Sequence, residues 1–190
     1  MTVSWKDPAW STAQAGVIKK TIQEQNELAR TRLVQGWDGL AVASGLADHR
    51  VQTLRKHFLN VEQVSSIQEK QRLSFMVTGG LGRHEISPFS DLDLVLICDE
   101  PESDEIRDFA NAFFYPLWDA GLDIGHAIRR PLDFYELVES DLTVLTASLD
   151  WRPVGGSALL LREFNDGLNA VLGSENVKAC MRGHMESWAE

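Results

Sequence analysis

Two short apolar segments, separated by a polar loop with three glycines, constrain the fold of this chain more than any other feature. Residues Leu73–Thr78 read LSFMVT, and residues Leu92–Cys98 read LDLVLIC. Both segments have the length and the apolar content of buried β-strands. The intervening GGLGRHEISPFSD carries glycines, a proline and serines, which are typical of a tight turn and a loop. The sequence therefore predicts a strand, a glycine turn, a loop and a second strand.

Apolar residues at helical spacing flank this unit on both sides. Two amphipathic helices are expected before it, one ending at Gly36 and one over Leu40–Phe58. The mixed order predicts an α/β (α+β) fold, in which a small mixed β-sheet carries helical flanks at both ends. We expect a helical lead-in over residues 1–70, a core over 71–156 and a C-terminal helical segment over 157–190. The later elements expected are a helix over Ile106–Ala120, a strand over Leu122–Arg129, a helix from Pro131, a helix over Ser157–Leu172 and a helical tail over 174–190.

The net charge of the chain limits the classes of partner that it can bind. Its 190 residues include 28 acidic and 18 basic side chains, for a formal net charge of −10. Binding to a nucleic-acid backbone or to an anionic membrane needs a basic surface, so we expect neither partner. A single nucleotide held through a metal ion is compatible with this charge. The two cysteines lack Cys-x-x-Cys spacing, no secretory signal opens the chain and no apolar run reaches membrane length, which predicts a reduced, cytoplasmic protein.

Two carboxylates at the start of the second apolar segment are the first candidates for chemistry. If Leu92–Cys98 is a strand, Asp91 and Asp93 point to one face, with Cα atoms about 6–7 Å apart. Carboxylates this close repel each other unless a cation lies between them, and Mg²⁺ prefers oxygen ligands shared with phosphates. An isolated Asp-x-Asp also occurs as a turn cap before a strand. Here the pair follows an apolar strand, two glycines and a basic residue, and this combination favours phosphoryl transfer.

The glycine turn is the matching candidate for the phosphates. Gly79 and Gly80 follow the first strand, and without Cβ atoms they let a phosphate approach the backbone closely. Arg83 lies in the following turn and could donate two hydrogen bonds to phosphate oxygens. Ser90, directly before the carboxylates, is assigned to nucleotide binding with them. Glu85 is interpreted as part of the loop architecture.

Two other segments resemble known binding motifs, but each has a better explanation. Gly80-Leu81-Gly82 resembles the start of a dinucleotide-binding fingerprint, but Glu85 stands at the third glycine position and the loop leaves no room for a crossover helix. The acidic stretch Asp99–Asp108 suggests a metal site, yet a solvated loop and the start of a helix explain it, because acids stabilise helix N-termini.

These residues resemble the nucleotidyltransferase superfamily that includes DNA polymerase beta. The similarity is closer to the N-terminal domain of the bacterial PII uridylyltransferase family, and it extends over residues 29–156. Four segments carry it, in this order: GWDGLAVASGLADHRVQTLRKHF at 36–58, GGLGRHEISPFSDLDLVLI at 79–97, LWDAGLDIGHAIR at 117–129 and DLTVLTASLDWRPVGG at 141–156.

The resemblance implies roles for individual residues. Gly79 and Gly80 would hold the triphosphate, and Asp91 and Asp93 would bind Mg²⁺. Members of the superfamily add a third carboxylate on a later strand. Asp123, in Leu-Asp-Ile, has the expected pattern and would complete the metal and catalytic set on the neighbouring strand, where it could polarise the attacking hydroxyl.

Two other aspartates are candidates for the third carboxylate, and a histidine lies close to Asp123 in the sequence. Asp141 and Asp150 are rivals of Asp123, although Asp141 is better explained as a helix cap. His126 lies three residues after Asp123, so the pleat of a strand points it to the opposite face. We expect it to pack or hydrogen-bond there.

The resemblance also implies an activity. It predicts a Mg²⁺-dependent transfer of UMP from UTP to a tyrosine hydroxyl of the PII nitrogen-regulatory protein, with release of pyrophosphate. A related transferase with another nucleotide or acceptor, of the adenylyltransferase or CBS-associated type, stays an alternative, as does a non-catalytic binding module. Base selection depends on side chains outside the motif. The phosphohydrolase and ACT domains of full uridylyltransferases have no room in 190 residues, so uridylyl removal and glutamine sensing are expected to be absent.

Overall fold

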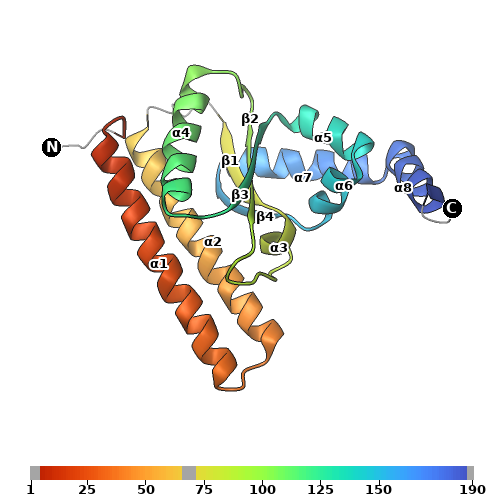
Figure 1. Cartoon of the computed structure of the whole chain (residues 1–190). Helices are drawn as coiled ribbons and strands as arrows, with labels where there is room; N and C mark the ends of the chain where they lie inside the picture. The colour runs from red at the N-terminus through yellow and green to blue at the C-terminus, as the bar shows by residue number, and fades with distance from the viewer. Residues whose placement is uncertain (1–4, 66–71, 188–190) are drawn as a thin grey trace.

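The computed structural model describes residues 5–65 and 72–187, which form helices around one four-stranded sheet (Figure 1). The strand order is β3-β2-β1-β4. β1 runs antiparallel to β2 and β4, whereas β2 and β3 are parallel, so the sheet is mixed as expected. The strands are β1 (Leu73–Val77), β2 (Leu92–Cys98), β3 (Ile124–Arg129) and β4 (Arg152–Gly156).

Helices cover both faces of the sheet (Figure 1). α2 (Gly39–Val64) and α4 (Asp104–Asp119) cover one face, and α1 (Pro8–Val34) packs against these two helices. α5 (Pro131–Ser140), α6 (Leu142–Leu149) and α7 (Ala158–Leu172) cover the other face, and α8 (Glu175–Ser187) packs against α5 and α6. Within the described ranges, no helix combines the length and the apolar character needed to cross a membrane.

Side-chain caps explain where several helices begin. Asp38 precedes α2, and its Oδ2 accepts a hydrogen bond from the backbone N–H of Ala41 at 2.8 Å. Ser103 caps α4 in the same way, and Pro131 opens α5 at a position where the missing N–H costs nothing. The helix boundaries are thus set locally, and the packing of the helices follows from their apolar faces.

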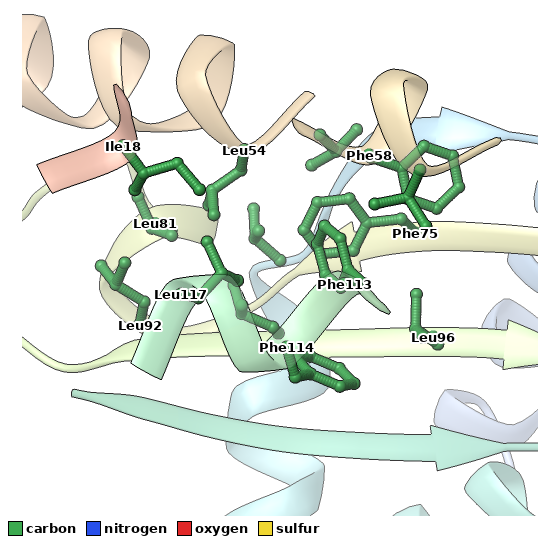
Figure 2. Packing of buried hydrophobic residues seen from close by; sticks show 14 of the residues in the cluster. Ile18, Leu54, Phe58, Phe75, Leu81, Leu92, Leu96, Phe113, Phe114 and Leu117 are labelled. Carbon is green, nitrogen blue, oxygen red and sulfur yellow. The ribbon is translucent and has the colours of Figure 1, made fainter. Parts of the chain in front are cut away.

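The core on the face of α2 and α4 combines leucine and other aliphatic side chains with a cluster of aromatic rings (Figure 2). The rings of Phe58, Phe75, Phe109 and Phe113 are fully buried. The ring centroid of Phe58 lies 5.5 Å from that of Phe75 and 5.3 Å from that of Phe109, and the centroids of Phe75 and Phe113 are 4.9 Å apart. Phe75 comes from β1, Phe58 from α2 and the other two from α4. Burying each ring stabilises the fold by roughly 2–3 kcal/mol relative to leaving it exposed. This cluster therefore joins α2 and α4 to the sheet.

The strand over Leu92–Cys98 is confirmed residue for residue, and the strand over Leu73–Thr78 ends one residue earlier than expected. The sequence did not reveal β4, because its RPVGG reads as a break. Its glycines are required by close packing, since a Cβ on Gly155 would lie 2.9 Å from the Phe58 ring and Gly156 has φ +95°. The tail is helical to Ser187, and residues 188–190 lie outside the described part.

Candidate active site

The carboxylate of Asp93 lies between two glycines at one end of the sheet. Gly79 has φ +57° and begins the one-turn helix α3 (Gly79–Gly82). A Cβ on Gly79 would overlap Oδ2 of Asp93, and a Cβ on Gly125 would lie 2.8 Å from Oδ1. Gly125 is the register partner of Asp93 on β3. The expected glycine turn is therefore confirmed as a turn of helix, and the side-chain space that both glycines leave is occupied by the Asp93 carboxylate.

Asp91 and Asp93 interact electrostatically. Leu92 and Leu94, which alternate with them, are buried in the aromatic core, so both carboxylates lie on the opposite face. Asp91 is exposed and Asp93 is half-buried. Burial raises the pKa of Asp93, the charge of Asp91 raises it further, and the charge of Arg83 lowers it. The pair is thus held together at a cost in free energy that a cation would offset.

Asp123 lies beside the start of β2, but it does not complete a three-residue metal-binding cluster among the described residues. Its carbonyl oxygen accepts a hydrogen bond from the N–H of Leu92 at 3.0 Å, directly before β3, so the expected neighbouring-strand position is observed. Among the described residues, no group of three or more His, Cys, Asp or Glu side chains is arranged to hold a metal ion. Asp91 and Asp93 are close enough to interact electrostatically, and the backbone of Asp123 is hydrogen-bonded to the residue between them.

The rivals of Asp123 have other contacts. Asp141 caps α6, because its Oδ1 accepts hydrogen bonds from the N–H groups of Thr143 and Val144 at 2.7 and 3.2 Å. This confirms its interpretation as a helix cap. Asp150 has its Oδ2 3.9 Å from Nη1 of Arg83.

His126 lies on the face opposite Gly125, where α4 covers the sheet. The centroid of its ring is 4.7 Å from that of Phe114 and 5.3 Å from that of Trp118. Its expected direction and packing role are therefore confirmed.

The remaining predicted site residues lie in the loop between α3 and β2. Gly80 is tightly enclosed, since a Cβ there would lie 2.8 Å from the carbonyl oxygen of Glu85. The N–H of Glu85 in turn donates to the carbonyl oxygen of Gly80 at 2.8 Å, which fits the architectural role of the loop. Ser90 accepts a hydrogen bond from the N–H of Ser87 at 2.9 Å, so its hydroxyl holds the turn before Asp91.

A cluster of charged residues that the sequence did not indicate anchors the glycine turn to α2. Nη1 of Arg152 lies 3.1 Å from Oδ1 of Asp48 and 2.8 Å from Nδ1 of His84. His84 follows α3 with φ +62°, an unusual conformation for a residue with a side chain. Its partners are distant in sequence, and β4, which supplies Arg152, was itself not expected. No local signal could have predicted this contact.

The residues at the strand ends fit a hard divalent cation and phosphates. Carboxylate oxygens are the donors that Mg²⁺ prefers, and the pKa of Asp93 is raised in part by Asp91, so bound positive charge would relieve their repulsion. Gly79 and Gly80 have no room for a Cβ, because the Asp93 carboxylate and the carbonyl oxygen of Glu85 occupy that space. The site therefore consists of two neighbouring carboxylates, Asp91 and Asp93, with Asp123 directly before the adjacent strand β3.

A fold and a site of this kind define a nucleotidyltransferase. The family model described as "Putative nucleotidyltransferase DUF294" matches residues 23–126, more than half of the chain. The chain belongs to this family and is an enzyme domain of the nucleotidyltransferase type.

Curated relatives confirm the resemblance to the uridylyltransferase family, and all three described here carry the name "Bifunctional uridylyltransferase/uridylyl-removing enzyme". The relative from Phenylobacterium zucineum is 30% identical over 151 residues, which cover 77% of this chain and 16% of the relative. The relative from Mycobacterium tuberculosis is 33% identical over 102 residues, 54% of this chain and 13% of the relative. The relative from Streptomyces coelicolor is 36% identical over 92 residues, 48% of this chain and 11% of the relative. The chain thus matches about a sixth or less of the length of these relatives.

Proposed function

We propose that this chain transfers UMP from UTP to a tyrosine hydroxyl of a PII-type signalling protein, with Mg²⁺ as cofactor and pyrophosphate as the second product. One observation carries the proposal: the Asp93 carboxylate lies between Gly79 and Gly125, on the same face as Asp91. The names of the curated relatives support uridylyl as the transferred group. The tyrosine of a PII-type protein is what the family resemblance implies.

Each residue has a role that follows from its position. Asp91 and Asp93 would hold Mg²⁺, which when bound supplies positive charge that stabilises the phosphoryl oxygens. Gly79 and Gly80 would offer backbone N–H groups to the β- and γ-phosphates, and the Arg83 guanidinium would donate hydrogen bonds to them.

Asp123 orients the acceptor and takes its proton. As the tyrosine oxygen attacks the α-phosphorus, a new O–P bond forms and the bond to pyrophosphate breaks. In-line displacement places the attacking oxygen opposite the leaving group. The glycine turn follows β1, whereas Asp123 precedes β3, and these strands flank β2 on its two sides, which supports an in-line arrangement.

A labelling experiment tests the activity. The chain is incubated with Mg²⁺, a purified PII-type protein and each of four α-labelled nucleoside triphosphates in turn. We expect label on the PII-type protein from UTP, and none when its acceptor tyrosine is changed to Phe. Label from ATP alone would overturn the UMP assignment, and label that persists in the tyrosine variant would overturn the acceptor assignment.

A further inference from the structure

The segment that leads into β4 packs directly against the glycine turn. α3 lies beside α2 at one end of the sheet (Figure 1). Arg152, the first residue of β4, pairs with Val77, the last residue of β1, so it lies beside the point where the chain enters the turn. At the other end of the turn, a Cβ on Gly82 would overlap the carbonyl oxygen of Asp150. Both ends of the turn therefore adjoin residues 150–152.

Arg152 joins this segment to α2 and to His84. Its Nη1 lies 3.1 Å from Oδ1 of Asp48 on α2, and it contacts both ring nitrogens of His84, with Nδ1 at 2.8 Å. A guanidinium can only donate hydrogen bonds, and a neutral imidazole has one acceptor nitrogen in either tautomer. The contact therefore suits a hydrogen bond from Arg152 to His84. We call Asp48, His84 and Arg152 the anchor cluster.

The backbone of His84 is held in a conformation that a side chain disfavours. Its φ is +62°, in the left-handed region that glycine adopts at no cost. The N–H of His84 donates to the carbonyl oxygen of Leu81 at 3.3 Å, and the N–H of Glu85 donates to that of Gly80 at 2.8 Å. The disfavoured residue thus lies among the hydrogen bonds that close the turn. Such a conformation persists only where surrounding contacts hold it, and the anchor cluster supplies contacts of this kind.

Arg152 is kept at a cost in free energy. Its side chain is 18% exposed, and among the described residues its buried Nε and Nη2 have no hydrogen-bond partner. Buried donors without partners destabilise a fold, and each one in a native structure needs an explanation. The cost indicates that Arg152 contributes something besides stability.

We propose that Arg152 is a positioning residue for the triphosphate: acting through His84, it holds the glycine turn in the conformation that binds phosphates. The inference rests on the proposed function, which places the triphosphate at this turn, and adds the residues that keep the turn in place. Arg152 does not bind the nucleotide itself, because its Nη1 is shared by Asp48 and His84 and its other nitrogens are buried. Phosphate contacts made equally before and during the reaction affect KM and leave kcat unchanged.

Two variants of His84 separate positioning from stability. His84→Gly removes the side chain and also removes the backbone strain, so it should fold at least as readily as wild type. His84→Asn keeps an acceptor oxygen for Arg152, and asparagine tolerates a positive φ. We expect the affinity for UTP and for inorganic tripolyphosphate, measured by calorimetry with Mg²⁺, to fall about tenfold in His84→Gly, as for other groups that orient a binding element. His84→Asn should recover most of this loss.

Arg152→Ala tests the other half of the cluster. Asp48 and His84 are both about half-exposed, so the substitution leaves neither of them buried without a partner. Arg72→Ala is the matched control, because Arg72 precedes the opposite end of β1 and pairs with Asp99 at 2.9 Å. We expect KM for UTP to rise about tenfold in Arg152→Ala with kcat within about twofold of wild type. Arg72→Ala should bind and transfer as wild type, and melting curves check that each variant is folded.

Hydrogen exchange measures the turn without any nucleotide. Backbone amides over residues 79–85 should exchange faster in Arg152→Ala and His84→Gly than in wild type and Arg72→Ala, because a turn that is no longer held opens more often. If Arg152→Ala does not fold, the two His84 variants still decide the inference.

The outcomes distinguish this inference from the proposed function. Equal tripolyphosphate affinities of His84→Gly and wild type would overturn the inference and leave the proposed transfer standing. A folded Arg152→Ala with an unchanged KM, or an Arg72→Ala with the same loss of affinity, would do so too. Wild type that labels no acceptor from UTP would instead overturn the proposed function, and the exchange and tripolyphosphate measurements would still decide the inference.

Discussion

The two faces of the sheet differ in what their buried groups contribute. Under α2 and α4 the sheet presents Phe75 to a cluster of fully buried rings that includes Phe58 and Phe113, which stabilises the fold. On the other face the end of the same sheet holds Asp93, whose pKa is raised by burial and by Asp91. Its charged form therefore costs free energy in the folded state. Both faces of the sheet are therefore stabilised by buried apolar side chains, but the face of Asp93 also carries, at its end, a charge that a bound cation would stabilise.

The largest expected effect is the loss of transfer rate when Asp91 or Asp93 is neutralised. Asp91→Asn and Asp93→Asn should each lower the transfer rate by on the order of a thousandfold or more, because the metal clamp is lost. Without metal, both variants should melt at the same temperature as wild type or higher, since an amide relieves the repulsion between the carboxylates. Melting curves and initial rates of labelling measure both effects.

Addition of Mg²⁺ and nucleotide should reverse the order of stability. Wild type gains from ligand binding and the variants gain little. If both variants melt several degrees lower without metal, and wild type shows no shift with it, the pair is a structural cap and the two faces do not differ as argued.

A substitution in the aromatic cluster under α2 and α4 should lower stability and leave the transfer rate unchanged. Phe113→Ala removes a fully buried ring that contacts Phe58 and Phe75, and it should lower the free energy of unfolding by about 3–5 kcal/mol. The transfer rate per folded molecule should stay near that of wild type. Denaturant titration with a labelling assay at low temperature checks this. A folded Phe113→Ala protein with a thousandfold lower rate would show that the aromatic core shapes the site directly.

A smaller change near Asp93 sharpens the comparison. A Cβ on Gly125 would lie 2.8 Å from Oδ1 of Asp93, so Gly125→Ala should push the carboxylate aside. We expect the transfer rate to fall roughly ten- to a hundredfold, as for other small misplacements of catalytic groups. Stability should change little. Gly16→Ala, where a Cβ meets nothing within 4 Å, is the control for adding a methyl group. Equal rates of Gly125→Ala and wild type would mean that the position of Asp93 is not critical.

The strand and loop elements of the site were predictable because they depend on local patterns. Leu92–Cys98 alternates so that Asp93 must oppose the buried leucines, and this alone indicates its face. The position of Asp123 beside β2 was predictable only because the family resemblance implies a third carboxylate there. The apolar-acid-apolar pattern of Leu122–Ile124 then identified the residue. Asp141 was identified as a helix cap because its position before a helix suits that role.

Features that depend on distant packing were not predictable. β4 contains a proline and two glycines, and it is a strand because β1 offers hydrogen bonds and Phe58 leaves no space for a side chain at Gly155. The contact of Arg152 with Asp48 depends on that unexpected strand.

The phosphate-binding role of Arg83 is separable from its ion pair. Arg83→Ala should weaken nucleotide binding by about 1.5–3 kcal/mol, the value of a charge-assisted hydrogen bond. It should hardly affect stability, because the half-exposed pair with Asp150 has an N–O distance of 3.9 Å. Asp150→Asn removes the same ion pair and keeps the guanidinium, so its nucleotide affinity should match that of wild type. Calorimetry with Mg²⁺ and UTP distinguishes the two variants, and equal losses in both would make Arg83 a structural residue.

The smallest expected effect is the pH dependence that Asp93 contributes. Burial also lowers the pKa of His57 in the aromatic core to about 4, but that contribution is common to wild type and Asp93→Asn and cancels in their comparison. Because the pKa of Asp93 is raised in the folded state, chiefly by burial, its contribution to stability is present at pH values below the ordinary aspartate pKa of about 3.9 and is lost as the pH rises through the folded-state pKa. Asp93→Asn should therefore melt about 1–2 °C above wild type near neutral pH, a small shift because the group is only half-buried. This difference should shrink steadily as the pH falls toward about 4, where wild type also carries a protonated group. Asp91→Asn should show a weaker pH dependence than wild type, since it removes the second cause of the shift. A difference between Asp93→Asn and wild type that stays constant over this range would mean that the substitution acts through shape, and the charge of Asp93 would then not distinguish the two faces.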